Sequence, residues 1–149
     1  MKKLRFILPV LLLSLTGCVT SRLKYIDNQV QFAKQNQVLI KEMAEYAVMF
    51  CLENNVSEFK SEIIADRIIR NKIAHLGSTI YVTYSNECCH YDSSVTFHTV
   101  SIGQGTQEFI YDFATNPRNM GSEKSITKES AFIQTSERVY YKKRPFPMI

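Results

Sequence analysis

Residues 95–113, VTFHTVSIGQGTQEFIYDF, consist of two runs of mixed apolar and polar side chains on either side of a glycine-containing turn. A period of two is typical of β-strands that bury one face only. We expect strands over 95–102 and 107–113, joined in a β-hairpin by the four-residue loop Gly103–Thr106. In that register His98 lies opposite Tyr111, and it shares a face with four apolar side chains: Val100, Ile102, Phe109 and Phe113.

Further strands are expected on both sides of this hairpin. Residues 79–84, TIYVTY, are rich in β-branched and aromatic side chains and predict a strand. Residues 131–135 and 138–142 are two more candidates. Residues 114–130, which are rich in Asn, Ser, Thr and Lys, are expected to be mostly loop.

The region before the strands shows helical spacing, roughly from Leu23 to Leu52. One apolar row has heptad spacing: Ile26, Val30, Ala33, Gln37, Ile40, Ala44, Ala47 and Cys51. A second row runs beside it: Tyr25, Phe32, Leu39, Met43, Tyr46 and Phe50. Together the rows are wider than one buried face requires. Either both rows contact the chain's own domain, or one row meets a partner or a second copy, with Phe32, Leu39, Tyr46 and Phe50 as the interface candidates.

A second helix is expected to begin at Ser57, whose side chain can accept backbone N–H bonds as an N-cap. It would carry an apolar row and end at Gly77 in a left-handed C-cap, with His75 in its last turn near the negative end of the helix dipole. A short link between the two helices favours an antiparallel helical hairpin. The expected fold class is therefore α+β: an N-terminal helical hairpin packed on a small antiparallel sheet.

The first residues predict export. Lys2, Lys3 and Arg5 precede an apolar run, Phe6–Leu15, that is too short to span a bilayer and is typical of a secretory signal. At its end, Leu15-Thr16-Gly17-Cys18 resembles the bacterial lipobox.

The lipobox resemblance implies three things about the mature protein. Residues 1–17 would be a cleaved signal peptide, Cys18 would carry diacylglycerol on its sulfur and an acyl chain such as palmitate on its amine, and 18–22 would be a short tether. Val19, in a place where aspartate would imply retention in the inner membrane, implies the outer membrane on its periplasmic side. Residues 23–149 are then one domain with a flexible C-terminal tail. The alternative is a plain signal peptide with Cys18 as an ordinary thiol.

Charge argues against nucleic-acid binding. Without Lys2, Lys3 and Arg5, the 18 basic residues become 15 against 14 acidic ones, so the mature chain is nearly neutral. Nucleic-acid binding needs an excess of cations on one surface, which this composition does not favour.

Three cysteines remain after Cys18: Cys51, Cys88 and Cys89. Exported cysteines meet an oxidising compartment, so disulfides are expected. Neighbouring Cα atoms lie about 3.8 Å apart, closer than a disulfide normally spans, so Cys88 and Cys89 should not pair with each other. We expect Cys51 to pair with one of them, and the sequence does not distinguish which.

Two chemical alternatives use the same region. A cysteine hydrolase could take Cys89 as nucleophile, His98 as base and Asp112 as orienting carboxylate, but the expected register puts the last two on opposite faces of the hairpin. A metal site could use Cys88, Cys89, His90 and His98, although their spacing matches no common structural site. We therefore expect no catalytic residues, no metal and no cofactor.

The sequence thus favours an outer-membrane lipoprotein that works as a non-enzymatic binding, assembly or escort component of a cell-envelope system. Its expected partners are the membrane, through Cys18, and an envelope protein or a second copy, through the first helix. Lys142-Lys-Arg144 could also touch lipid phosphates or acidic glycans, although three charges near a tail are more often only solvated. The alternatives are an envelope cysteine hydrolase and an inhibitor or immunity lipoprotein.

Overall fold

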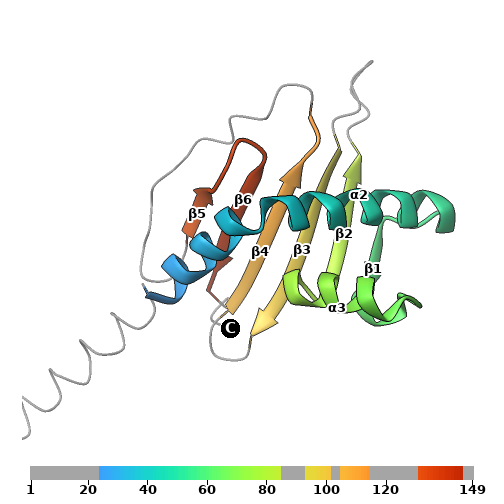
Figure 1. The fold of residues 1–149 in the computed structure, drawn as a ribbon, viewed down its shortest axis with the longest axis horizontal. Helices are drawn as coiled ribbons and strands as arrows, with labels where there is room; N and C mark the ends of the chain where they lie inside the picture. The colour runs from blue at the N-terminus through green and yellow to red at the C-terminus, as the bar shows by residue number, and fades with distance from the viewer. Residues whose placement is uncertain (1–23, 85–92, 102–104, 115–130, 146–149) are drawn as a thin grey trace, which may run out of the picture.

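The computed structural model describes residues 24–84, 93–101, 105–114 and 131–145. They form a six-stranded antiparallel sheet whose strand order is β1-β2-β3-β4-β6-β5, with helices lying across one face (Figure 1). The predicted α+β class, with N-terminal helices packed on an antiparallel sheet, is confirmed.

The strands match the predicted pattern closely, with one addition. Strands β2 to β6 lie at or within two residues of the five predicted segments, whereas β1 is a short extra strand at the edge. Their bounds are β1 (Glu58–Lys60), β2 (Thr79–Tyr84), β3 (Ser93–Ser101), β4 (Gly105–Asp112), β5 (Ala131–Gln134) and β6 (Val139–Arg144).

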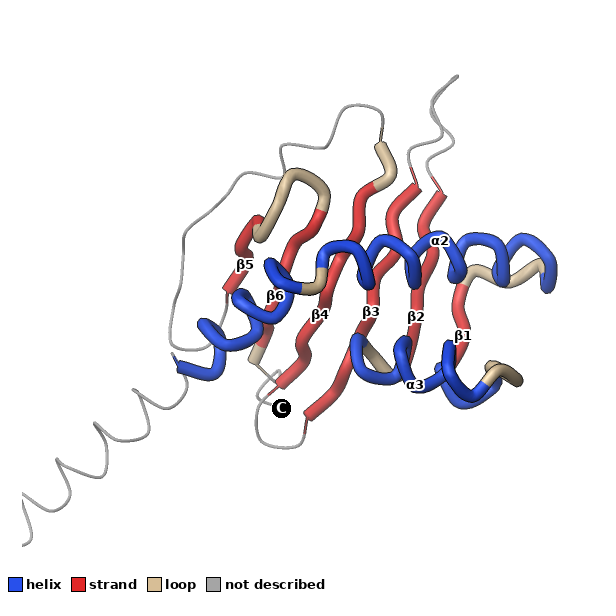
Figure 2. Tube along the Cα trace, viewed as in Figure 1, coloured by secondary structure: helices blue, strands red, loops and turns tan. Residues whose placement is uncertain are grey.

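The predicted long N-terminal helix is present with one interruption. Residues 24–35 are helical, Asn36 leaves the helical conformation, and α2 (Gln37–Asn54) continues across the sheet after a bend (Figure 2). Asn55 ends α2 in the left-handed conformation, with φ of 53°. The helical run crosses the sheet from the β6 side to the β1 side (Figure 2).

Both apolar rows of the helical run contact the chain's own domain. In the first row every side chain except Gln37 is buried against the sheet. In the second row, Phe32 meets the rings of His75 and Phe109 at 5.5 and 5.6 Å, and Phe50 meets Phe59 at 4.5 Å. The wide apolar surface that the two rows form is therefore covered within the domain, by the sheet and by the segment 59–75.

The predicted helix from Ser57 is wrong in its first half. The Ser57 carbonyl accepts a hydrogen bond from Val82 N (2.8 Å), residues 58–60 pair with β2, and η1 (Ser61–Ile63) is a single 3-10 turn. The helix α3 (Arg67–Leu76) begins later, where the Asp66 carboxylate accepts from Ile68 N and Ile69 N. The apolar residues Phe59 and Ile64 fill the core from a strand and a bend rather than from a helix.

The left-handed cap at Gly77 is also wrong, because its φ of −175° is extended. Glycine is nevertheless required there, since a Cβ would lie only 2.7 Å from His98 N and Phe97 C of the neighbouring strand. The close approach of α3 to β3, rather than backbone conformation, accounts for this residue.

The register predicted for the β3–β4 hairpin is wrong by three residues. His98 faces Glu108, Phe97 faces Phe109 and Val95 faces Tyr111. The strand resumes at Gly105, which has φ of +88° and pairs directly with Ser101, so the connection is shorter than expected. Because the shift is odd, His98 lies on the face away from the helices, whereas Phe109 lies beneath them.

Candidate functional site

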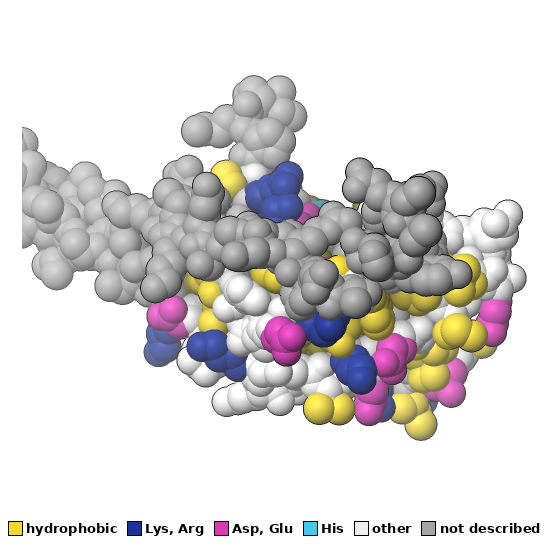
Figure 3. Space-filling model, turned by 90° about the horizontal axis from the view of Figure 1, so that it is seen from above, with side chains coloured by type: hydrophobic (Ala, Val, Ile, Leu, Met, Phe, Trp, Pro, Cys, Tyr) yellow, Lys and Arg dark blue, Asp and Glu magenta, His cyan; other side chains and the backbone are white. Residues whose placement is uncertain are grey.

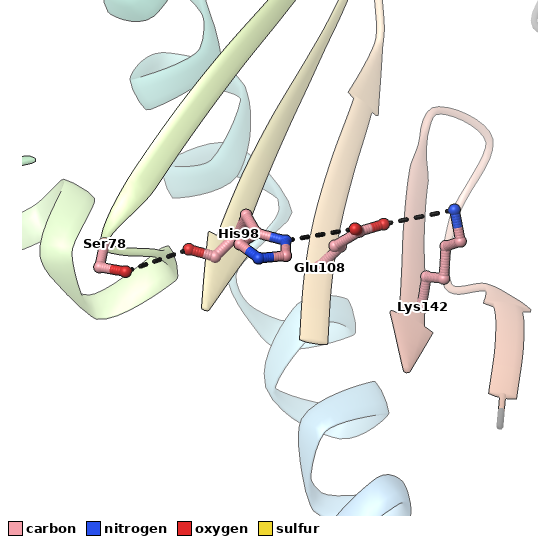
Figure 4. Close-up of polar contacts among 4 residues, drawn as sticks. All are labelled: Ser78, His98, Glu108 and Lys142. Atoms are coloured by element: carbon pink, nitrogen blue, oxygen red, sulfur yellow. Dashed lines mark hydrogen bonds and ion pairs between the residues drawn. The ribbon is translucent and has the colours of Figure 1, made fainter. Parts of the chain in front are cut away.

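Three ionisable side chains form a row on the sheet face opposite the helices. His98 on β3, Glu108 on β4 and Lys142 on β6 are direct cross-strand neighbours (Figure 4). His98 Nδ1 lies 3.2 Å from Glu108 Oε1, and Lys142 Nζ lies 3.3 Å from Glu108 Oε2. The side chains are only 20, 16 and 24% exposed, respectively. One carboxylate thus joins two basic groups in a partly screened row.

This row suits a structural role better than a catalytic one. A carboxylate on Nδ1 of an imidazole resembles the orienting half of an acid–base site, which also needs a nucleophile on the other ring nitrogen. The Ser78 hydroxyl beside His98 in Figure 4 donates instead to the backbone carbonyl oxygen of His98 (3.4 Å). Opposite charges on adjacent strands stabilise the pairing and oppose a register slip.

The structure brings together only part of the predicted hydrolase set. His98 and Asp112 lie on the same face, not on opposite faces as predicted, but Asp112 stands four residues beyond Glu108 on β4, roughly 13 Å along the strand. The Asp112 carboxylate is buried and accepts from Ala114 N (2.9 Å). Glu108 is therefore the carboxylate that orients His98, while Cys89 lies outside the described residues.

Cys51 occupies the last turn of α2 and faces the sheet, where it is 1% exposed. Burial raises the pKa of its thiol. Its two predicted disulfide partners, Cys88 and Cys89, lie outside the described residues, as do Cys18 and His90. The disulfide and the lipidation stay predictions.

The four interface candidates on the helical run are all half-buried and pack against the core: Phe32, Leu39, Tyr46 and Phe50. Burial raises the pKa of the Tyr46 hydroxyl, and the nearby Asp66 and Glu53 carboxylates raise it further. Packed in this way, these side chains keep only part of their surface in solvent, and their role in binding a partner stays a prediction.

A third group of apolar side chains on α2 faces solvent, and it belongs to neither of the two apolar rows. Val38, Met49 and Leu52 are 71, 55 and 61% exposed. At about 100° per residue, the spacings of eleven and fourteen residues place them within roughly 60° of one another on the helix surface. We call these three residues the α2 outer face. The sequence interpretation followed the two longer apolar rows, but the spacing of these three residues could have revealed the exposed group.

Acidic groups lie within and beside the α2 outer face. Glu42 and Glu45 lie on the same exposed side, where Lys41 Nζ is 3.7 Å from Glu45 Oε1, and Glu53 follows Leu52. Toward the end of α2, hydrophobic and acidic side chains lie side by side at the right of Figure 3. The α2 outer face is therefore a mixed surface, in which exposed apolar side chains alternate with acidic ones.

No protein-family model, curated protein or solved structure matches the chain. Within the described part of the chain, no three His, Cys, Asp or Glu residues are grouped so that they could hold a metal ion. Among the described helices, none is both long and apolar enough to cross a membrane.

Proposed function

We propose that this chain is an outer-membrane lipoprotein, anchored through Cys18 and facing the periplasm, that binds an envelope protein without catalysing a reaction. The lipobox-like stretch Leu15–Cys18 and the short leader support the anchor. The α2 outer face supports the binding role and is the observation on which the proposal depends.

α2 exposes more apolar surface than is usual for a surface helix. A surface helix normally has one apolar stripe toward the core and polar residues on the opposite side, whereas a helix that is apolar all round is buried. α2 buries one row on the sheet and another against the segment 59–75, and it still carries the α2 outer face in solvent. A partner that covers the α2 outer face would bury these three apolar side chains.

The energy available at this surface suits a specific but moderate interaction. Full burial of a Val, Met or Leu side chain contributes about 1.5–3 kcal/mol relative to exposure. Because more than half of each side chain of the α2 outer face is exposed, a partner could regain much of that energy. The acidic side chains among and beside these residues favour a partner with basic groups next to apolar ones.

Site-specific photo-crosslinking in cells tests the proposal. A photoreactive amino acid at Val38, Met49 or Leu52 should give one discrete adduct, and Met49→Glu should abolish the adduct formed from position 52. Lys72 and Ala74, exposed on α3, are the matched control positions. The absence of an adduct at the α2 outer face, or equal adducts at the α3 positions, would contradict the binding role.

Mass spectrometry of the membrane-purified protein tests the anchor separately. We expect acyl chains on an N-terminal Cys18. An unmodified thiol at Cys18 would leave the α2 surface unaffected but would overturn the lipoprotein assignment.

A further inference from the structure

The start of the helical run is tied to the ends of two strands. The Tyr25 hydroxyl donates to Gln107 Oε1 (2.8 Å), and Lys143 Nζ lies 5.1 Å from the centre of the Tyr25 ring. Gln107 and Lys143 are register partners on β4 and β6. The first helical turn, the beginning of β4 and the end of β6 therefore form one end of the molecule.

Cations outnumber anions at this end. Lys24 and Arg144 are exposed, and Lys142 keeps 24% of its side chain in solvent. We call these three residues the basic end. The nearby acids are Asp27 and Glu108, and Glu108 is already shared by His98 and Lys142. Residues 53–67, toward the opposite end of the helical run, contain four acids, Glu53, Glu58, Glu62 and Asp66, and only two bases, Lys60 and Arg67.

We infer that the basic end lies against the phosphate groups of anionic phospholipids and sets the orientation of the domain on the membrane. The inference rests on the anchor at Cys18 in the proposed function. Lys24 follows Cys18 by six positions, so Lys24 stays within about 20 Å of the attachment point. Lys and Arg side chains held that close to an anionic surface are attracted to it.

The orientation has a consequence for the α2 outer face. The helical run over residues 24–54 leads away from the basic end and extends up to about 45 Å at 1.5 Å per residue (Figure 1). Met49 and Leu52 lie near its far end. The domain is therefore oriented with its basic end against the lipid and with Met49 and Leu52 of the α2 outer face away from the lipid.

Lysine labelling on vesicles tests this orientation. The full-length lipidated protein is reconstituted in vesicles of phosphatidylcholine alone, or of phosphatidylcholine with phosphatidylglycerol, and is treated with a water-soluble amine-reactive ester. Mass spectrometry then gives the labelling rate of each lysine. We expect Lys24 to react several-fold more slowly on the anionic vesicles and to recover at high salt. Lys41, Lys60 and Lys72, exposed elsewhere, serve as internal controls.

A matched pair of variants tests the charge itself. Arg144→Gln removes a cation from the basic end, and Arg67→Gln removes an exposed cation from the start of α3. Only Arg144→Gln should weaken the protection of Lys24. Equal labelling of Lys24 on both vesicles, or equal protection of the control lysines, would overturn the inference.

Flotation of the same vesicles separates this failure from a failure of the proposed function. A chain that floats while Lys24 stays unprotected retains its anchor and overturns only the orientation. A chain that does not float has no anchor, and both the lipoprotein assignment and the orientation are then overturned.

Discussion

The hydroxyl of Tyr141 is a buried oxygen without a hydrogen-bond partner in the described part of the chain. Its ring packs against Phe109 at 5.5 Å under the helical run, and the side chain is fully buried. Burial, and to a lesser extent the neighbouring Tyr25, raise the pKa of Tyr141 well above its usual value. The ring stabilises the core by packing, whereas the oxygen loses contact with water and gains no hydrogen bond in return.

Tyr141→Phe should therefore leave the free energy of unfolding unchanged or raise it by about 1 kcal/mol at neutral pH. The wild type should also lose stability above about pH 10, because the unfolded chain releases the Tyr141 proton and the folded chain keeps it. The slope is up to about 1.4 kcal/mol per pH unit, and the variant should lack this contribution. Urea unfolding at several pH values measures both effects.

Tyr25→Phe is the matched control for this prediction. It removes a hydroxyl that does donate a hydrogen bond, to Gln107, and should cost about 0.5–1.5 kcal/mol. A loss of stability in Tyr141→Phe as large as that in Tyr25→Phe would mean that the Tyr141 hydroxyl is satisfied.

Among the elements, α2 is the one whose sides have three different roles. One side faces the sheet, one faces the segment that leads to α3, and the α2 outer face is in solvent. A charge should therefore destabilise the fold on one side of this helix and be tolerated on another. Leu39, half-buried on the second row, and Met49, exposed on the outer face, provide the comparison.

Leu39→Glu should lower the free energy of unfolding by about 2–4 kcal/mol, because it places a carboxylate against apolar side chains. Met49→Glu should change it by less than about 0.5 kcal/mol. Urea unfolding followed by far-UV circular dichroism gives both values. If Leu39→Glu stays as stable as wild type but loses a partner, the sequence-based interface is right and Leu39 belongs to it.

Local sequence patterns predicted most of the helices and strands. The period-two segments became β2 to β6, and the helical rows became the long run over 24–54, because these patterns follow directly from burial of one face. Residues 57–66 were misassigned, since Phe59, Ile63 and Ile64 suit helical spacing as well as a strand followed by a bend. Asp66, with two N–H groups within its reach, was the overlooked cap.

The candidate site was less predictable because it depends on register. The position at which β4 resumes is set by Gly105, whose left-handed backbone pairs with Ser101. A three-residue error in the predicted register placed His98 on the wrong face of the sheet, so its contact with Glu108 was not predicted. A histidine at 98 and a carboxylate at 108 were a usable signal for the pairing, whereas the neighbours of Lys142 and the contact between Tyr25 and Lys143 depend on β6 lying beside β4.

For the whole molecule, the strand order predicts where stability is concentrated. β3 and β4 are the longest strands and share the longest ladder, and β6 lies between β4 and β5 although it comes last in the sequence. The edges, β1 and β5, have three and four residues. Short edge strands open more easily than interior ones, because fewer contacts must be broken.

Amide hydrogen exchange should follow this order. We expect the slowest exchange in β3 and β4, protection nearly as strong in β6, and faster exchange in β1 and β5. Peptide-resolved mass spectrometry distinguishes these segments. Exchange in β6 as fast as in β5 would show that β6 is not an interior strand.

The interior position of β6 also determines when the fold can be completed. Strands β1 to β4 are contiguous neighbours and can pair as the chain lengthens, but β4 keeps an open edge until residues 139–144 arrive. β5 precedes β6 in the chain yet contacts the sheet only through it. Truncation before Val139 would therefore leave residues 131–134 in the chain without the strand that joins them to the sheet, so two strands would be lost through one cut.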